Sequence, residues 1–252
     1  MGYFQYGKYQ VYYELHGTGD PIILLHGNTA TSSMFAPIIP ALQREYTVIT
    51  MDFLGCGKSD RIPVWPCDLW FDWSEQVYGL CKHLELEHVV IIGISGGALA
   101  AINVALEHPR LVKAVVADSF AGVQADSLIL SQIQNGRDAA RQIEGVRSYL
   151  YSLHGEDWEQ VLDADTDAIL RHGNEIGAYF HCPIETLAVR MLLTGSEADE
   201  MFPSGHYGQL FCDICKRTER AESHIFCDGG HPAMLSNMND FVEMMNWFIH
   251  AK

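Results

Sequence analysis

Ser95 is the residue whose surroundings point most clearly to chemistry. It stands in Gly93-Ile94-Ser95-Gly96-Gly97, after an apolar run and before an Ala-rich segment with helical spacing. This order of strand, Gly-x-Ser-x-Gly and helix predicts a nucleophilic serine on a tight turn. The two outer glycines let the strand and the helix approach each other without Cβ clashes. The free N–H groups at the start of the helix would face any negative charge that develops beside the serine.

An acyl-transfer site also needs two N–H donors that point at the oxyanion of the tetrahedral intermediate. The apolar run 22–25 ends in His26-Gly27-Asn28, which places flexible backbone at the edge of a sheet. We expect the backbone N–H groups of Asn28 and Gly96 to be these donors. His26 ends an apolar strand, and we interpret it as a structural histidine that hydrogen-bonds to nearby loops.

The elements that would position these residues alternate along the chain. Five short runs are predicted to be strands, most of them with the composition of strands covered on both faces. They are residues 46–51, 89–94, 112–117, 187–194 and 223–226. Apolar residues at helical spacing fall at 34–44, 72–84, 98–107 and 239–250. The alternation predicts a mostly parallel sheet with helices on both faces.

Two regions depart from this alternation. Residues 11–15 and 22–25 are joined by Gly17-Thr18-Gly19-Asp20, a connection that suits an antiparallel hairpin. Residues 122–184 contain helix-like segments, at 138–153 and 158–170, but no convincing strand. We interpret this long stretch as an insertion between one strand and the next.

Composition argues against several classes of protein. The 252 residues are 48% hydrophobic and 19% charged, which is the balance of a globular chain with a full core. The formal charge of −16 repels phosphate backbones and acidic membranes, so neither nucleic acid nor a membrane is an expected partner. The first residues lack the pattern of a signal peptide, and we expect a soluble, cytoplasmic protein. Seven scattered cysteines favour reduced thiols.

Five motifs together resemble the α/β-hydrolase superfamily, and in particular its capped, cofactor-free, esterase-like members. Besides the turn at Ser95, they are His26-Gly27-Asn28, the loop 52–60, the segment 194–199 and Gly229-Gly230-His231-Pro232. Their order, with the serine first, then the acid and then the histidine, is that of the superfamily. The resemblance implies the α/β-hydrolase fold, a mostly parallel sheet of approximately eight strands flanked by helices.

The resemblance also implies that His231 and Asp199 complete a catalytic triad with the serine. His231 would take the proton of the serine, and Asp199 would fix the tautomer of the imidazole. The segment that carries Asp199 is one residue longer than the common family pattern, so Glu197 and Glu200 compete for the same role. Asp118, at the end of the preceding strand, is a further alternative because some relatives place the acid there.

Residues 122–184 resemble the helical cap of this family, above a core formed by residues 1–121 and 185–252. Aromatic side chains in or beside the cap are candidates to line an apolar substrate site. They are Phe120, Tyr149, Trp158 and Tyr179. Three acids of the cap, Asp163, Asp165 and Asp167, are expected to form a solvated face, because the glycine and the distal Glu of a calcium loop are missing.

A serine at the turn argues against the dehalogenases and epoxide hydrolases of the superfamily, which need a carboxylate nucleophile. We therefore predict a serine hydrolase that acts on a small-molecule ester, thioester or lactone through an acyl-Ser95 intermediate. No metal or cofactor is implied, because a triad and two backbone amides suffice for acyl transfer. A carbon–carbon bond hydrolase or an exopeptidase with the same triad stays open. So does a small-molecule binding or signalling module on the same fold.

Overall fold

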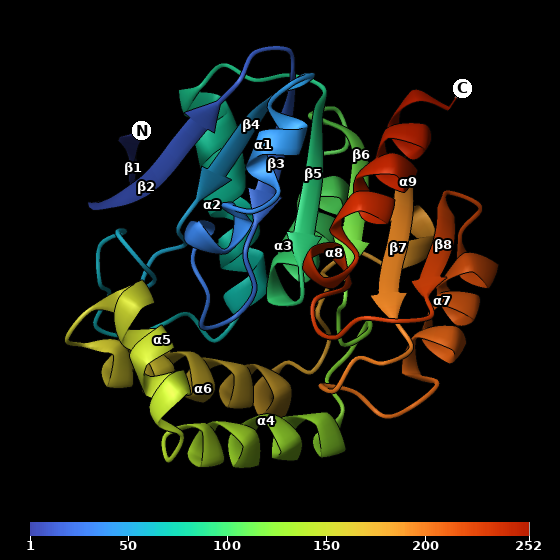
Figure 1. Ribbon diagram of the computed structural model, residues 1–252. Helices are drawn as coiled ribbons and strands as arrows, with labels where there is room; N and C mark the ends of the chain where they lie inside the picture. The colour runs from blue at the N-terminus through green and yellow to red at the C-terminus, as the bar shows by residue number, and fades with distance from the viewer. Residues whose placement is uncertain (252) are drawn as a thin grey trace.

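The computed structural model describes residues 1–251 and contains one eight-stranded sheet (Figure 1). The strands lie in the order β1-β2-β4-β3-β5-β6-β7-β8, and only the pairs β1–β2 and β2–β4 are antiparallel. The strands are β1 (Gly2–Tyr6), β2 (Tyr9–His16), β3 (Asp20–Leu25), β4 (Tyr46–Met51), β5 (Val89–Ile94), β6 (Val112–Asp118), β7 (Arg190–Ser196) and β8 (Ala221–Phe226). The predicted mostly parallel sheet is confirmed.

The predicted hairpin between residues 11–15 and 22–25 is wrong. β2 pairs with β4, and β3 lies on the other side of β4, where it pairs in parallel with β4 and β5. The four residues from Ile22 to Leu25 are completely buried, which requires a strand in the interior of the sheet with helices on both faces. A glycine-rich connection permits a sharp turn, but burial decides which strand becomes the neighbour.

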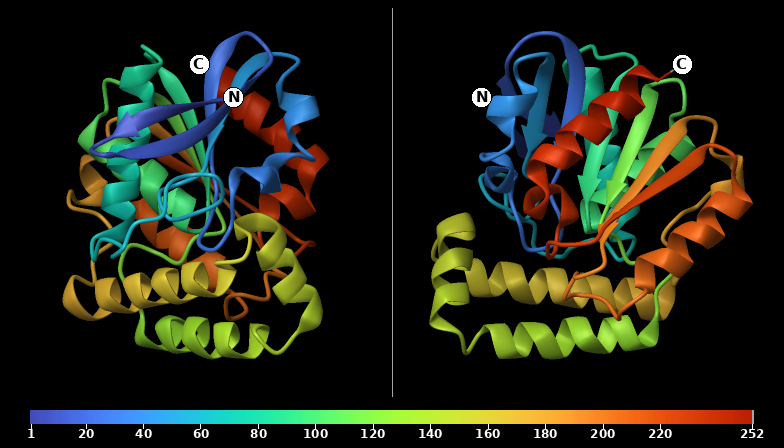
Figure 2. Two further views of the ribbon diagram at one scale, coloured as in Figure 1. Left: turned by 90° about the vertical axis from the view of Figure 1, so that its left-hand side faces the viewer. Right: turned by 45° about the vertical axis from the view of Figure 1, so that its right-hand side comes forward.

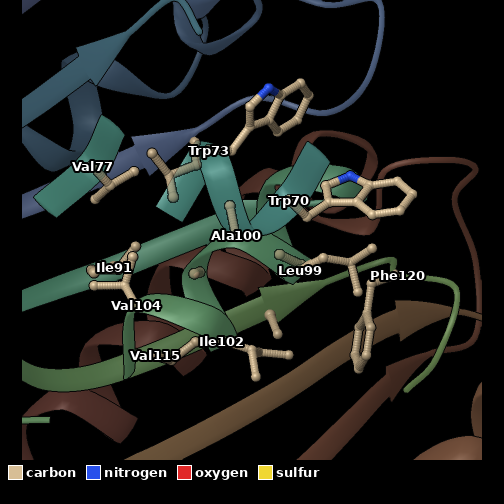
Figure 3. Close-up of a cluster of buried hydrophobic side chains, with 14 of the residues drawn as sticks. Trp70, Trp73, Val77, Ile91, Leu99, Ala100, Ile102, Val104, Val115 and Phe120 are labelled. Carbon is tan, nitrogen blue, oxygen red and sulfur yellow. The ribbon is translucent and has the colours of Figure 1, made fainter. Parts of the chain in front are cut away.

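Two apolar layers cover the faces of the sheet. On one face lie α2 (Leu69–His83), α3 (Gly96–Glu107) and α7 (His206–Arg217). On the other lie the short helices η1 (Ser32–Phe35), α1 (Ile39–Leu42) and α8 (Ala233–Ser236), together with α9 (Met238–His250). Figure 3 shows the first layer, in which Trp73 and Val77 of α2 pack with Ala100 and Val104 of α3. The packing in these layers fixes the position of α3 relative to β5.

Two predicted helices are shorter in the structure than in the sequence pattern. The segment 34–44 contains two separate turns, η1 and α1, because Pro37 and Pro40 cannot donate the backbone hydrogen bonds of a continuous helix. The segment 138–153 is divided between α4 (Ser127–Ala140) and α5 (Glu144–His154). Ile143 has an extended backbone, with φ −97° and ψ 114°, and separates the two helices.

The helices α4, α5 and α6 (Trp158–Glu175) form a further layer, which we call the cap. Figures 1 and 2 show this layer lying across the end of the sheet to which the parallel strands point. The chain enters and leaves the cap side by side, since Gln124 and Ala178 form an antiparallel bridge and the Tyr179 N–H donates to the Val123 carbonyl at 3.1 Å. Over residues 1–251, no helix is both long and apolar enough to cross a bilayer.

Candidate active site

Ser95 occupies the turn between β5 and α3 in a strained conformation. Its φ is 55° and its ψ is −119°, a backbone region that side chains other than glycine rarely adopt. The turn is fixed on both sides, because the Ser95 N–H donates to the Asp118 carbonyl at 2.8 Å and the Ser95 carbonyl accepts from the Ala98 N–H at 3.0 Å. The hydroxyl therefore stands at the end of β5, at the first turn of α3.

The glycines around this turn are required by close approach. A Cβ atom on Gly93 would lie 2.1 Å from the Gly97 carbonyl oxygen, and one on Gly97 would lie 2.3 Å from the Leu25 carbonyl oxygen. A Cβ atom on Gly27 would lie 3.0 Å from the Cβ of Ser95. The loop after β3 is thus brought directly against the serine.

The two predicted N–H donors lie together beside Ser95. Within residues 1–251, neither the Asn28 N–H nor the Gly96 N–H donates to another protein group. Gly96 begins α3, where the first N–H groups have no partner inside the helix. A Cβ atom on Gly96 would lie 2.0 Å from Asn28 Oδ1, so the two residues face each other closely. Two free N–H groups at this point can donate hydrogen bonds to a developing oxyanion.

His231 is held by a buried carboxylate. Its Nδ1 lies 2.8 Å from Asp199 Oδ2, and the two side chains are 16% and 2% exposed. The same oxygen accepts from the Tyr207 hydroxyl at 2.6 Å, while Oδ1 accepts from the Met201 N–H at 2.8 Å. Burial opposes ionisation of Asp199, but the hydrogen bonds from His231, Tyr207 and Met201 together lower the pKa of this carboxyl. Asp199 is thereby kept charged beside the imidazole.

The competing acids take other positions. Asp118 accepts from the Thr194 hydroxyl at 2.6 Å and from the Met234 N–H at 3.1 Å. Burial raises the pKa of Asp118 to about 6. Glu200 accepts from the backbone N–H of His231 at 3.1 Å, and Glu197 is exposed. Of the four carboxylates that the sequence offered, the one hydrogen-bonded to the imidazole is that of Asp199.

The sheet brings Ser95 and His231 to a common edge. β5 to β8 are parallel, so the residues that follow them meet at one end of the sheet. The segment after His231 is anchored near Ser95. The Ala233 N–H donates to the hydroxyl of Ser119 at 2.9 Å, and Ser119 directly follows Asp118, whose carbonyl accepts from the Ser95 N–H. In the described part of the chain, the Ser95 hydroxyl makes no hydrogen bond to His231.

His26 has the structural role predicted for it. It is completely buried, its Nδ1 lies 2.8 Å from the Gly27 carbonyl, and its Nε2 lies 3.1 Å from the Phe53 N–H. Since a carbonyl accepts and an N–H donates, the proton resides on Nδ1. Burial lowers the pKa of His26, which keeps the ring neutral.

The four aromatic candidates lie in different environments. Phe120 is completely buried and stacks on Phe211 with ring centroids 6.1 Å apart (Figure 3 shows its position). Tyr179 is 3% exposed and contacts the ring of Trp70 edge-on at 4.9 Å. Trp158 is half-buried at the start of α6, and Tyr149 on α5 is 51% exposed. The exposure of Tyr149 gives a substrate-binding role no support.

The prediction that Asp165 belongs to a solvated face is wrong. Successive helix residues are rotated by about 100°, so a residue two positions away points to the opposite side. Asp163 and Asp167 are exposed, whereas Asp165 is completely buried between α4 and Asn28. Within residues 1–251, no group of three or more His, Cys, Asp or Glu side chains is placed to hold a metal ion.

Sequence reasoning missed Tyr207 and placed Asp165 on the wrong side of its helix. Tyr207 lies eight residues after Asp199 in the sequence. It belongs to α7, a helix that was not among the predicted elements. Asp165 lies in the segment Leu162-Asp163-Ala164-Asp165-Thr166-Asp167-Ala168, where apolar and acidic residues are mixed. The helical phase of its neighbours Val161, Ala168 and Ile169, all buried, was the signal that could have identified it.

Comparison with known proteins extends this description. Residues 20–142 match the family described as alpha/beta hydrolase fold. The 2-(acetamidomethylene)succinate hydrolase of Mesorhizobium japonicum is 29% identical over 53% of this chain, which spans about half (49%) of that relative. The crystal structure of the enol-lactonase from Burkholderia xenovorans has a TM-score of 0.74 and 16% identity, and the match covers 98% of this chain and 99% of the other.

A further relative is matched over most of its length. The 2-hydroxymuconate semialdehyde hydrolase of a Pseudomonas species is 31% identical over 265 aligned residues, which cover 92% of this chain and 88% of the relative. The match therefore includes the cap as well as the sheet. On this similarity and on the fold described above, the chain belongs to the α/β-hydrolase family.

Proposed function

We propose that the protein is a serine hydrolase that cleaves a small-molecule ester, thioester or lactone through an acyl-Ser95 intermediate. One observation carries the proposal. Ser95 has a strained backbone (φ 55°) beside the free N–H groups of Asn28 and Gly96, at the sheet edge that also carries the His231–Asp199 pair. Strain at a reactive side chain is maintained where the surrounding structure over-determines it, as the contacts of this turn do.

The reaction would begin with transfer of the Ser95 hydroxyl proton to Nε2 of His231 while Oγ bonds to the carbonyl carbon. The carbonyl oxygen becomes an oxyanion that accepts from the N–H groups of Asn28 and Gly96. The bond to the leaving group then breaks, and the imidazolium gives its proton to that group. Water repeats the sequence on the acyl-enzyme and releases the acid. Asp199 holds the imidazole through Nδ1 and stabilises its charged form.

A carbon–carbon bond hydrolase is the second candidate. The observation that favours it is the 31% identity, over 92% of this chain, with the relative named 2-hydroxymuconate semialdehyde hydrolase. The same triad would serve, but the leaving group would be a carbon that takes the proton from His231. Esters and diketones therefore need to be compared directly.

Fluorophosphonate labelling tests the first proposal. We expect mass spectrometry of the intact protein and of its peptides to find a single adduct, on Ser95. Ser95→Ala should abolish the adduct, and Asp199→Asn should slow ester turnover by about 10⁴-fold, because the imidazole then lacks its orienting carboxylate. Asp118→Asn is the matched control, since Asp118 makes no hydrogen bond to the imidazole, and it should keep both labelling and turnover.

The outcomes separate the candidates. Turnover of activated esters, thioesters or lactones supports the proposal. Turnover of diketones without any of these would favour the carbon–carbon bond hydrolase. A folded wild-type protein with neither adduct nor turnover would overturn both and favour a binding module.

A further inference from the structure

The loop that carries Asn28 is held by the cap. Thr29 has a φ of 59°, which is costly for a β-branched residue, so this turn needs outside support. His154, from the end of α5, lies with its Nε2 3.1 Å from the Thr29 carbonyl and its Nδ1 3.1 Å from the Gly57 N–H. The carbonyl needs a donor and the N–H an acceptor, so a neutral ring with its proton on Nε2 satisfies both contacts.

A second cap residue contacts Asn28 itself. Asp165, in the middle of α6, accepts from Asn28 Nδ2 through its Oδ1 at 2.7 Å. The Asp165 side chain is completely buried, and a buried carboxylate is costly unless it is paired. Its Oδ2 lies 2.5 Å from the guanidinium of Arg137 on α4, and Arg137 also donates to the Thr166 hydroxyl at 2.8 Å. The carboxylate is therefore fixed in orientation by a second cap helix.

The core holds the other side of Asn28. Trp70 Nε1 donates to Asn28 Oδ1 at 3.2 Å, and the Thr29 hydroxyl donates to the Asn28 carbonyl at 2.7 Å. Both polar atoms of the Asn28 side chain are thus engaged, one by the core and one by the cap. Among the described residues, its backbone N–H has no acceptor, and this N–H is the group assigned to the oxyanion.

We propose that Asp165 is a positioning residue through which the cap completes the oxyanion hole. With Arg137 and His154 it holds the Asn28–Thr29 turn so that the Asn28 N–H points at the developing oxyanion. The inference rests on the proposed function, because it assumes that the oxyanion forms beside Ser95. It means that the hole is complete only while the cap is seated on the core, and that cap contacts contribute to the transition state without touching the substrate.

Asp165→Asn and Asn28→Ala test this role. We expect kcat for an activated ester to fall about 10-fold to 100-fold, which is part of the effect of losing one oxyanion donor, while KM changes little. The affinity for an alkyl boronic acid, which forms a tetrahedral adduct with the serine, should fall by a similar factor. The two substitutions act on one contact, so the double variant should lose little more than either single variant.

Asp163→Ala is the matched control. Asp163 lies on the same helix as Asp165, but it is exposed and faces away from Asn28. It forms an ion pair with Arg141, the residue directly after α4. It should keep wild-type kcat and boronate affinity. If Asp165→Asn does not fold, Asp165→Leu combined with Arg137→Met removes the buried carboxylate together with its partly buried partner and should show the same loss of kcat.

Each result then decides one question. A folded wild-type protein that gives neither a fluorophosphonate adduct nor turnover of an activated ester would overturn the proposed function. Normal wild-type labelling with unchanged kcat and boronate affinity in the folded Asp165 variants would overturn the positioning role alone. A rise in KM with unchanged kcat would assign Asp165 to substrate binding and also overturn it. Parallel losses of kcat and boronate affinity, absent from Asp163→Ala, support it.

Discussion

The Asp199 carboxylate accepts the Tyr207 hydroxyl on the same oxygen that meets His231. Tyr207→Phe removes this donor while keeping the ring packed. We expect kcat to fall and the free energy of unfolding at pH 7 to decrease by about 1.5 to 3 kcal/mol, the usual range for a hydrogen bond to a charged group. Chemical denaturation at pH 7 and ester kinetics measure the two effects.

The effect of Tyr207→Phe should depend on pH. The folded pKa of Asp199 is lowered, so its carboxylate stabilises the fold above the ordinary aspartate pKa of about 4. That stabilisation is lost as the pH falls through the folded pKa. The difference between wild type and variant should therefore shrink below about pH 4. A difference that stays constant down to pH 3 would show that packing, and not the charge, is responsible.

Asp118 should show the opposite dependence on pH. Burial raises its folded pKa to about 6, above the ordinary value, so the folded state binds a proton that the unfolded state has already lost. Its contribution to stability therefore falls as the pH rises from about 4 to about 6. When the pH rises from 4 to 7.5, the free energy of unfolding of Asp118→Asn should increase by about 1 to 3 kcal/mol relative to that of the wild type. Urea denaturation at both pH values measures the gain, and a loss over that range would contradict it.

The tight turn at Ser95 and the pairing of Asp199 with His231 could be predicted because short local sequences mark the turns that carry these residues. Glycines that remove steric clashes at Ser95 and the order of the segments are properties of the sequence itself. Asp165 and Tyr207 could not be predicted in the same way. Asp165 contacts Asn28, which is 137 residues away in the sequence, and Tyr207 contacts Asp199, which is 8 residues away. Both contacts depend on how a helix, α6 or α7, is rotated about its axis against the core.

At the scale of secondary structure elements, β5 and α3 approach each other so closely that only glycine fits between them at residue 93. Gly93→Ala would place a Cβ atom 2.1 Å from a backbone oxygen of α3, which cannot move without shifting the helix. We expect it to lower the free energy of unfolding by about 3 kcal/mol, the upper part of the range for overpacking, and to reduce activity because Ser95 is displaced. Thermal unfolding and ester turnover measure both.

Gly136→Ala is the control: it is the same substitution, but it should raise the free energy of unfolding instead of lowering it. Gly136 is exposed within α4, and a Cβ atom there would meet nothing within 4 Å. Alanine should stabilise the helix by about 0.5 to 1 kcal/mol, because it restricts the unfolded chain and favours helical backbone. Equal effects of the two substitutions would mean that the approach of β5 to α3 is looser than the geometry implies.

The elements of the sheet were more predictable than those around it. Strands β4 and β5 fall at the predicted residues because their apolar runs are fully covered. The pairing of β2 was predicted wrongly, since neighbours in a sheet are chosen by burial and not by connection length. α7 was missed because its apolar face is narrow, with Tyr207, Phe211 and Ile214 buried in an otherwise polar helix.

At the scale of the whole molecule, the cap and the net charge act together on the substrate. Figure 2 shows the cap lying across the end of the sheet that carries Ser95 and His231, so a substrate of the proposed reaction would have to pass the cap to reach Ser95. The formal charge of the chain is −16. A field of this sign reduces the local concentration of anions near the protein and leaves neutral molecules unaffected.

This argument predicts how turnover depends on salt. Raising the ionic strength from 0.01 M to 1 M shortens the screening length from about 30 Å to about 3 Å. We expect kcat/KM for an anionic ester, such as a hemisuccinate, to rise several-fold over this range, because repulsion by the protein is screened. The propionyl ester of the same alcohol is the matched neutral substrate and should change little. If the anionic ester instead loses kcat/KM on addition of salt, positive charge at the entrance, and not the net charge of the molecule, governs its approach.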